Sequence, residues 1–336
     1  MLRLFAHAQY DFIGLRRWAY GLSALLILPG LVLLLVRGLN YSIEFTGGTF
    51  LQVEAARSVS TAQLRAALEG AGIVGSEIQT FGADTVYAIR ARIGQTGDAS
   101  TQSVVEAVGR ALDAAVGADA YRIVRTEGVT PKVGGELQEK AIMAILFSFV
   151  VTLIYLAARF EWRFGVAAVF ATAHDIAATI AFIRYLDLEV SLVVVAAVLT
   201  IVGYSLNDTI VIFDRVRENL RKFRRQNLYE ILNLSVNETL PRTILTGGTT
   251  MMTALALAFI AGEVIRPFSL VMAFGILVGT FSSIYVAAPV LLWIERRWPG
   301  QDVRGARAYA GPDFAPGTTS GAVPAPATGG RPKAAV

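Results

Sequence analysis

A carboxylate lies inside a long apolar run, in the stretch "GYSLNDTIVIFDRVREN" at residues 203–219. Asp208 precedes Asp214, the first charge beyond the run, by six residues, which places it about 9 Å inside the border of a membrane helix. A charge at that depth costs a few kcal/mol, and such residues usually face a bundle interior or a water-filled path. A carboxyl group in a low dielectric also holds its proton more tightly than in water. Asp208 is therefore a candidate proton carrier.

Polar neighbours of Asp208 recur at four-residue spacing on the same predicted helix. Thr200, Tyr204 and Asp208 would share one face, with Asn207 beside them. Because such a stripe fits poorly against lipid, Tyr204 and Asn207 are predicted as supporting polar residues. The alternative is structural, since polar side chains also join membrane helices by hydrogen bonds.

Two further polar sites occur in neighbouring apolar segments. His174 and Asp175 fall near the middle of one segment, in "FATAHDIAATI", and Arg242 opens another, in "LPRTILTGGTTMMT". The long Arg242 side chain could reach inward to pair with a carboxylate, or it could anchor the helix at the interface. The His174–Asp175 pair could support proton transfer or join helices. If Arg242 is within reach of Asp208, protonation of the Asp208 carboxylate would break their attraction and so act as a proton switch.

Small residues indicate close helix packing in the last two apolar segments. Thr246 belongs to a face of glycines and threonines at 246–253, and Gly275 and Gly279 form a G-x-x-x-G pair. Such faces let backbones approach each other. Such faces allow helices to slide past one another or, more commonly, to pack in one fixed position. Thr246 is predicted as a supporting polar residue of the Asp208 site.

The composition predicts that these elements belong to a polytopic α-helical membrane protein. The chain has 336 residues, 54% of them hydrophobic and only 17% charged. A membrane span needs roughly 20 apolar residues in a helix. Six windows qualify, at about 16–36, 140–158, 165–185, 189–213, 241–262 and 267–294. The net charge of +4 forms no basic patch with interleaved aromatic residues, so nucleic acid is not an expected partner.

The distribution of Lys and Arg predicts the orientation of the spans. Basic residues gather near the N-terminal segment 1–15, at Arg3, Arg16 and Arg17, after the second span, in the loop predicted at 214–240 and after the sixth span. These regions share one side if the spans alternate, so both termini are predicted to be cytoplasmic. The first span, 16–36, is longer than a signal-peptide core and leads into Arg37 without a small-residue cleavage site, so it is expected to remain as an anchor.

A separate domain is predicted between the first two spans, at residues 38–136, outside the cytoplasm. Its pattern alternates short strands with two helices in the order βαββαβ, which predicts an α+β ferredoxin-like fold. A Ser60/Thr61 cap begins the first of these helices, and the second and third strands are joined around Ala83 and Asp84. The domain has no Cys or His, so we expect no metal or cofactor site there. Spans two to six form a predicted helical bundle at 140–298, and the Ala-, Gly- and Pro-rich tail at 299–336 is expected to be disordered.

Several motifs occur in an order that resembles the SecD/SecF family of protein-export membrane proteins, of the resistance-nodulation-division type, and its SecF members in particular. The motifs are "GLNYSIEFTGG", "TPKVGGEL", "HD", "GYSLNDTIVIFDRVREN", "RTILTGGTT" and "GTFSSIYVAAPVLL". They span nearly everything from the first helix to Trp298. The chain departs from the pattern at Ser42, Glu44, Gly247 and Phe281.

The resemblance implies a subunit without enzymatic activity that assists protein export at the bacterial inner membrane. Its expected partners are SecD, the SecYEG channel with the SecA motor, unfolded exported proteins and, as a further candidate, YajC. Protons would be the coupling ion, with no other cofactor. By position in the motifs, Asp208 matches the proton-carrying carboxylate and Arg242 its basic neighbour, while the role of His174 and Asp175 stays open.

Two other classes of protein share the buried carboxylate. Half of a proton-driven small-molecule efflux transporter would also need it, although such transporters usually have larger outer domains. A passive assembly factor would use Asp208 only to join helices. An intramembrane hydrolase is disfavoured because no nucleophile constellation accompanies His174 and Asp175.

Overall fold

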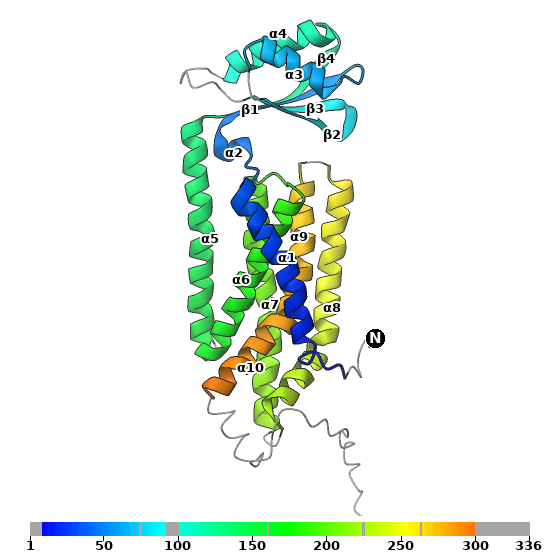
Figure 1. The fold of residues 1–336 in the computed structure, drawn as a ribbon. Helices are drawn as coiled ribbons and strands as arrows, with labels where there is room; N and C mark the ends of the chain where they lie inside the picture. The colour runs from blue at the N-terminus through cyan, green and yellow to red at the C-terminus, as the bar shows by residue number, and fades with distance from the viewer. Residues whose placement is uncertain are drawn as a thin grey trace, which may run out of the picture.

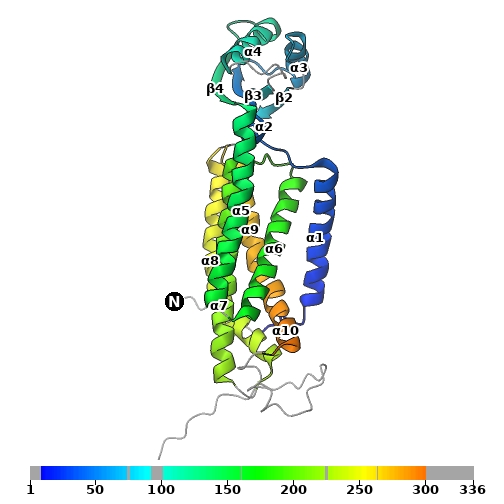
Figure 2. The same ribbon diagram turned by 90° about the vertical axis from the view of Figure 1, so that its left-hand side faces the viewer.

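The protein consists of a bundle of long helices with a small α/β domain at one end (Figures 1 and 2). This computed structural model describes residues 9–73, 76–91, 101–159, 161–223, 226–262 and 264–299. The predicted tail at 299–336 lies outside the described residues from residue 300 onward, as do the first eight residues of the predicted segment 1–15.

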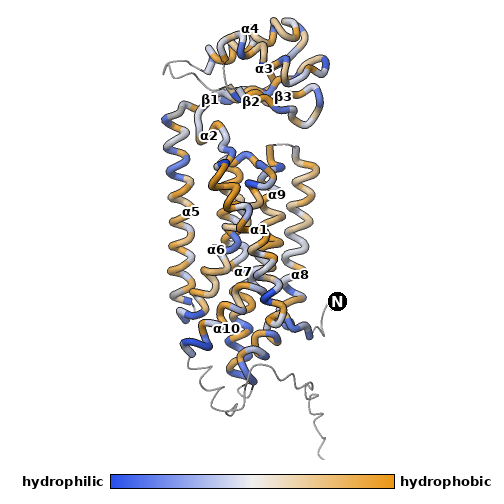
Figure 3. The backbone as a smooth tube through the Cα atoms, in the orientation of Figure 1, coloured by the Kyte–Doolittle hydropathy of each residue, from blue (hydrophilic) through white to orange (hydrophobic). Residues whose placement is uncertain are grey.

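Within the described residues, six helices are long and apolar enough to cross a membrane. They are α1 (Arg16–Arg37), α5 (Pro131–Arg159), α6 (Trp162–Tyr185), α7 (Leu192–Lys222), α8 (Leu228–Ile260), and a sixth that runs from α9 (Arg266–Ser282) through a π-helical turn (Ser283–Ala287) into α10 (Ala288–Arg297). The backbone is hydrophobic along most of their length, and hydrophilic residues gather near the ends of several helices (Figure 3). Helices α6, α7 and α9 are the most buried, whereas α1 and α5 leave most of their side chains exposed.

The segment at 214–240, predicted as a loop, is mostly helical. Helix α7 continues to Lys222, and α8 begins at Leu228, where the Asn227 side chain caps it by accepting a hydrogen bond from the Glu230 amide. The prediction was wrong because it ended each helix where its apolar run ended. Both extensions are amphipathic instead, and their buried residues, such as Val216 and Val236, join the core at that end of the bundle.

Helix α8 bends near Pro241, between its first turns and its long apolar part (Figure 1). Proline has no amide hydrogen and its ring crowds the preceding turn, so it kinks a helix. The bend comes where the sequence placed the start of the fifth span.

The small domain contains a four-stranded antiparallel sheet with the strand order β2-β3-β1-β4. Along the chain its elements are β1 (Gly48–Ala55), α3 (Thr61–Gly70), β2 (Glu77–Phe81), β3 (Ala83–Ala91), α4 (Thr101–Val116) and β4 (Tyr121–Val129). Both helices cover the same face of the sheet (Figure 1), and their apolar residues, such as Leu68 and Val108, pack on Leu51 and Ile89. Ser60 caps α3 as predicted, by accepting from the Gln63 amide.

The sequence pattern suggested a turn between β2 and β3 at Ala83 and Asp84. In the structure this turn lies one residue earlier, at Gly82. Gly82 has a φ of +80°, a conformation that glycine adopts without the steric cost of a Cβ. Ala83 already pairs with Phe81, so β3 begins directly after a very tight turn.

The chain that enters the small domain is fixed to the loop between α6 and α7. Val190 donates its amide to Asn40, and its carbonyl accepts from the Ser42 amide. The short helix α2 (Ile43–Thr46) follows and packs on α5. An ideal Cβ on Gly134 of α5 would lie 2.8 Å from the Phe45 carbonyl oxygen, so a glycine is needed for this approach.

Candidate proton-transfer site

Asp208 is buried in the middle of the bundle, on the face of α7 that packs against α9. Its side chain is 2% exposed. The Thr280 hydroxyl on α9 donates to its Oδ2 over 3.4 Å, a long hydrogen bond. No other side-chain hydrogen bond to Asp208 is found among the described residues. The carboxyl group is thus withdrawn from water with little compensation.

Arg242 lies on α8, directly after the bend at Pro241, and its side chain is exposed. Its guanidinium is near enough to act electrostatically on Asp208, but the two form no ion pair in the described part of the chain. The predicted direct pairing is therefore not present in this arrangement. Joining the groups would need a different Arg242 rotamer or a movement of α8.

The other residues predicted around Asp208 divide between the bundle interior and its surface. The Tyr204 hydroxyl is buried, has no hydrogen-bond partner among the described residues, and lies 3.9 Å from an ideal Cβ on Gly247. Thr246 donates to the Arg242 carbonyl of its own helix, at 2.9 Å. Asn207 is exposed, as is Thr200, so the predicted stripe is split between two faces of α7. The Tyr204 hydroxyl therefore lies in the bundle interior, one turn of α7 before Asp208.

A second buried carboxylate, Asp175 on α6, is fully engaged in hydrogen bonds. Ser205 of α7 and Ser282 of α9 both donate to its Oδ2, the latter at 2.7 Å. Its Oδ1 lies 3.0 Å from Nδ1 of His174, whose Nε2 lies 3.0 Å from the Ser23 hydroxyl on α1. This cluster joins four helices, which is the structural alternative considered for His174 and Asp175.

Sequence reasoning missed the role of the hydroxyl groups on α9. Thr280 and Ser282 are two residues apart, yet one contacts Asp208 and the other Asp175. The sequence signal was the stretch "TFSS", residues 280–283, which directly follows the second glycine of the G-x-x-x-G pair. Gly279 explains the close approach, because an ideal Cβ there would lie 3.0 Å from the Ser205 Cβ. Helix α9 therefore connects both carboxylates.

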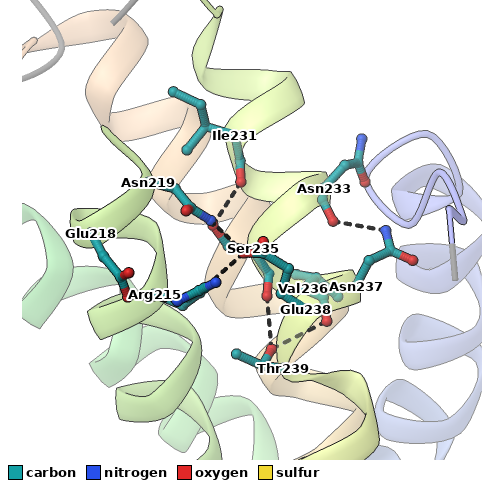
Figure 4. Close-up of polar contacts among 10 residues, drawn as sticks. All are labelled: Arg215, Glu218, Asn219, Ile231, Asn233, Ser235, Val236, Asn237, Glu238 and Thr239. Carbon is teal, nitrogen blue, oxygen red and sulfur yellow. Dashed lines mark hydrogen bonds and ion pairs between the residues drawn. The ribbon is translucent and has the colours of Figure 1, made fainter. Parts of the chain in front are cut away.

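The charged end of the α7 motif clamps α7 to α8 beyond the apolar part of the bundle. Figure 4 shows Arg215 and Asn219 of α7 pointing toward Glu238 and Ser235 of α8. Arg215 Nε and Asn219 Nδ2 each donate to Glu238 Oε2 at 2.7 Å, and Asn219 also donates to the Ser235 hydroxyl at 3.1 Å. The sequence suggested no partner for these residues. Their contacts fix the helix that carries Arg242 against the helix that carries Asp208.

The described residues contain no cluster of three or more His, Cys, Asp or Glu side chains that could hold a metal ion. The site consists of a buried carboxyl in contact with the Thr280 hydroxyl of α9, the buried Tyr204 hydroxyl one turn earlier on α7, and an exposed guanidinium on a bent helix. Such groups can take up, hold and release a proton.

The fold and site define a multi-pass membrane protein with a small antiparallel-sheet domain outside its helices. The family model described as protein export membrane protein SecD/SecF, C-terminal, matches residues 109–297, and the SecD/SecF GG motif matches residues 32–59. The chain belongs to the SecD/SecF family of bacterial protein-export membrane proteins.

Curated relatives and solved structures agree with this membership. The chain is 55% identical over 307 residues to protein translocase subunit SecF of Gemmatimonas aurantiaca, covering 90% of this chain and 92% of the relative. It is 38% identical to the subunit of the same name from Escherichia coli O157:H7, covering 84% and 87%. The crystal structure of SecDF from Thermus thermophilus, titled a translocon-associated membrane protein, matches with a TM-score of 0.79 and 36% identity over 88% of this chain. This chain spans 40% of that SecDF chain.

Proposed function

We propose that this chain is the SecF subunit of a protein-export complex, in which it works with SecD to convert the proton gradient into movement that promotes translocation through SecYEG after SecA. Family membership and the names of the relatives support the role in Sec protein export. The SecDF structures support the SecD partner, because this chain would account for about two fifths of such an assembly.

The contrast between Asp208 and Asp175 carries the proton-transfer part of the proposal. Both carboxyl groups are almost fully buried, with 2% and 1% exposure. Asp175 accepts two hydroxyl hydrogen bonds and contacts His174, so a change of its charge would disturb four helices. Asp208 has one long hydrogen bond, so it can exchange a proton without breaking such a network. Asp208 is the carrier, and Asp175 holds the bundle together.

A proton that crosses 100 mV releases about 2.3 kcal/mol. That is enough to shift a two-state equilibrium roughly fiftyfold, since 1.4 kcal/mol is a factor of ten. In the proposed cycle, the ionised Asp208 attracts Arg242, and protonation releases it. Helix α8 then changes its packing against α9, on the small-residue faces that both helices contain.

The bundle surface supports the need for a membrane partner. Thr200, Gly203 and Asn207 form an exposed row on α7, and α8 exposes Gly248, Thr249 and Thr253. A side-chain amide is costly against hydrocarbon, because lipid offers it no hydrogen-bond partner. SecD would cover this surface in the assembled complex.

We assign the small domain to the ferredoxin-like class and place it outside the cytoplasm. The element order with two helices on one face, and the strand order β2-β3-β1-β4, support the class. The basic residues at the opposite end of the bundle support cytoplasmic termini and a location in the inner membrane. On that side the chain would meet SecA, and a role for YajC would require contacts within the same membrane.

The test is export of a secreted substrate into inverted vesicles that contain this chain and its SecD partner, with and without a proton gradient. Asp208→Asn should assemble but lose the gain from the gradient, whereas the matched variant Glu230→Gln, at an exposed carboxylate of α8, should keep it. Equal responses of the native protein and Asp208→Asn would overturn the proposal. They would leave the passive assembly factor as the explanation.

The efflux alternative predicts a different phenotype for the same variant. A half-transporter would change the susceptibility of cells to small toxic compounds, without changing export of secreted proteins. Measuring both in cells that carry Asp208→Asn separates the two functions.

A further inference from the structure

A basic pocket lies at the end of the bundle opposite the small domain, between the end of α5 and the charged end of α7. It has a volume of about 630 Å³ and is lined by Arg159, Asp214, Arg217, Glu218, Arg221 and Lys222. Four of these side chains are cationic and two are anionic. The pocket is separate from Asp208, and neither the proposed proton transfer nor the clamp between α7 and α8 uses its arginines.

The two acidic residues of the pocket each face a cation. Arg159 lies 3.8 Å from Asp214, and Arg215 donates to Glu218 at 2.6 Å. Arg217 and Arg221 are four residues apart, so their side chains leave α7 on the same face. With four cationic and two anionic side chains, the lining has a net positive charge, which suits an anionic ligand.

The position of the pocket relative to the apolar helices indicates what kind of anion would bind. Asp214 directly follows Phe213, the last residue of the apolar run of α7, so the pocket begins at the border of the hydrocarbon region. On α5, Tyr155 and Val151 lie one and two turns from Arg159 on the same face, and they are 52% and 47% exposed. An apolar surface thus continues from the basic pocket toward the membrane interior.

We propose that this pocket binds the headgroup of an anionic phospholipid, with an acyl chain along Tyr155 and Val151 of α5. Basic pockets between membrane helices at the cytoplasmic border suit phosphate headgroups, because the charge is complementary and the acyl chains stay in hydrocarbon. Arginine also matches phosphate oxygens with paired donors. A soluble phosphate compound would leave the apolar surface unused, so the lipid is the occupant that fits both halves of the site.

The experiment is native mass spectrometry of the full chain, purified in detergent and titrated with phosphatidylglycerol or phosphatidylethanolamine. The native chain should retain phosphatidylglycerol preferentially. The double variant Arg217→Gln/Arg221→Gln should bind it about thirtyfold more weakly, since each basic residue near an anionic surface contributes about fivefold. The matched control Arg296→Gln/Arg297→Gln, which removes the same charge at the exposed end of α10, should retain the preference.

Three results would overturn the proposal. Equal losses in both double variants would mean that the lipid responds to overall charge and not to this pocket. Displacement of phosphatidylglycerol by an equal concentration of glycerol 3-phosphate would mean that the site binds a small soluble anion. Unchanged lipid retention in Arg217→Gln/Arg221→Gln would mean that the lipid binds elsewhere on the chain. If the same variant, co-expressed with SecD, also lost SecD during purification, the pocket would bind an acidic segment of a protein partner.

Discussion

Glu44 accepts a hydrogen bond from the backbone amide of Leu192, at 2.6 Å and across 148 residues of sequence. Leu192 is the first residue of α7, so this carboxylate satisfies an amide that the helix itself cannot pair. A negative charge at a helix N-terminus is also favourable. Glu44, one of the departures from the family pattern, thus joins the entry to the small domain to the helix that carries Asp208.

Replacing Glu44 with alanine should loosen this junction. Removal of a helix cap costs about 1 kcal/mol, which corresponds to about fivefold faster local opening. Hydrogen–deuterium exchange should therefore quicken in residues 40–47 and 190–194. Glu54→Ala, which removes an exposed carboxylate of β1, serves as the control. Unchanged exchange in Glu44→Ala would show that the backbone bonds of Val190 hold the junction alone.

Gly279→Ala should destabilise the bundle. The added Cβ would lie 3.0 Å from the Ser205 Cβ and 3.2 Å from its Cα, and overpacking of this kind typically costs about 1–3 kcal/mol. Gly248→Ala is the matched control, because its Cβ would meet nothing within 4 Å, and alanine favours a helix by up to about 1 kcal/mol. Unfolding of the full chain in mixed micelles measures both. Equal stability of the two variants would contradict the close packing of α9 on α7.

The ion pair between Arg163 and Glu295 joins the start of α6 to α10. Nε and Oε1 are 2.9 Å apart, and the side chains are 13% and 2% exposed. Arg163→Met should lower the free energy of unfolding by about 3 kcal/mol, because it removes this cation from a buried carboxylate. The double variant Arg163→Met/Glu295→Met should recover much of that loss. A single variant as stable as the native chain would show that the pair contributes nothing.

The segment before α1 should respond to acid through Asp11. Burial alone would raise the pKa of this carboxyl, but hydrogen bonds from Tyr229, the Gly14 amide and Asn233 hold it below the ordinary value of 3.8. A depressed folded-state pKa stabilises the contact above that ordinary value, and the stabilisation is lost as the pH falls through the folded value. The segment should thus stay attached to α8 near neutral pH and loosen in acid, below pH 3.8.

A fluorescent label measures this release. The chain has no cysteine, so Tyr10→Cys supplies a unique site whose backbone still bonds to Asn237. Anisotropy of the label should fall on acidification, and the added change Asp11→Asn should abolish that pH dependence. If the anisotropy of the label does not change with pH in the chain that retains Asp11, the Asp11 carboxylate does not hold the segment before α1 to α8.

The spans and the element order of the small domain were predictable because they depend on local patterns. Apolar runs of about 20 residues and alternating strands are visible in the sequence, as is the Ser60 cap. Asp208 was predictable for a similar reason, since a carboxylate inside an apolar run is unusual wherever the helix packs.

Contacts between distant helices were not predictable from one sequence. Spacing on α7 placed Thr200 and Asn207 with Asp208, but which face is buried depends on where α9 packs. The Thr280 contact and the exposure of Arg242 follow from that packing and from the bend at Pro241. The amphipathic ends of α7 and α8 were missed because their buried residues face one another and not the membrane.

The passage from β4 into α5 makes α5 a lever for the small domain. Only Thr130 separates Val129 from Pro131, and Gly134 seats the start of the helix on α2. With 29 residues, α5 is about 43 Å long, so a tilt of about 10° at its start would displace its far end by about 7 Å. That far end carries Arg159, and most side chains of the helix are exposed in the part of the chain that the structure describes, so little packing resists the swing. A small rotation of the small domain on one side of the membrane would thus become a larger displacement of the end of α5 on the other side.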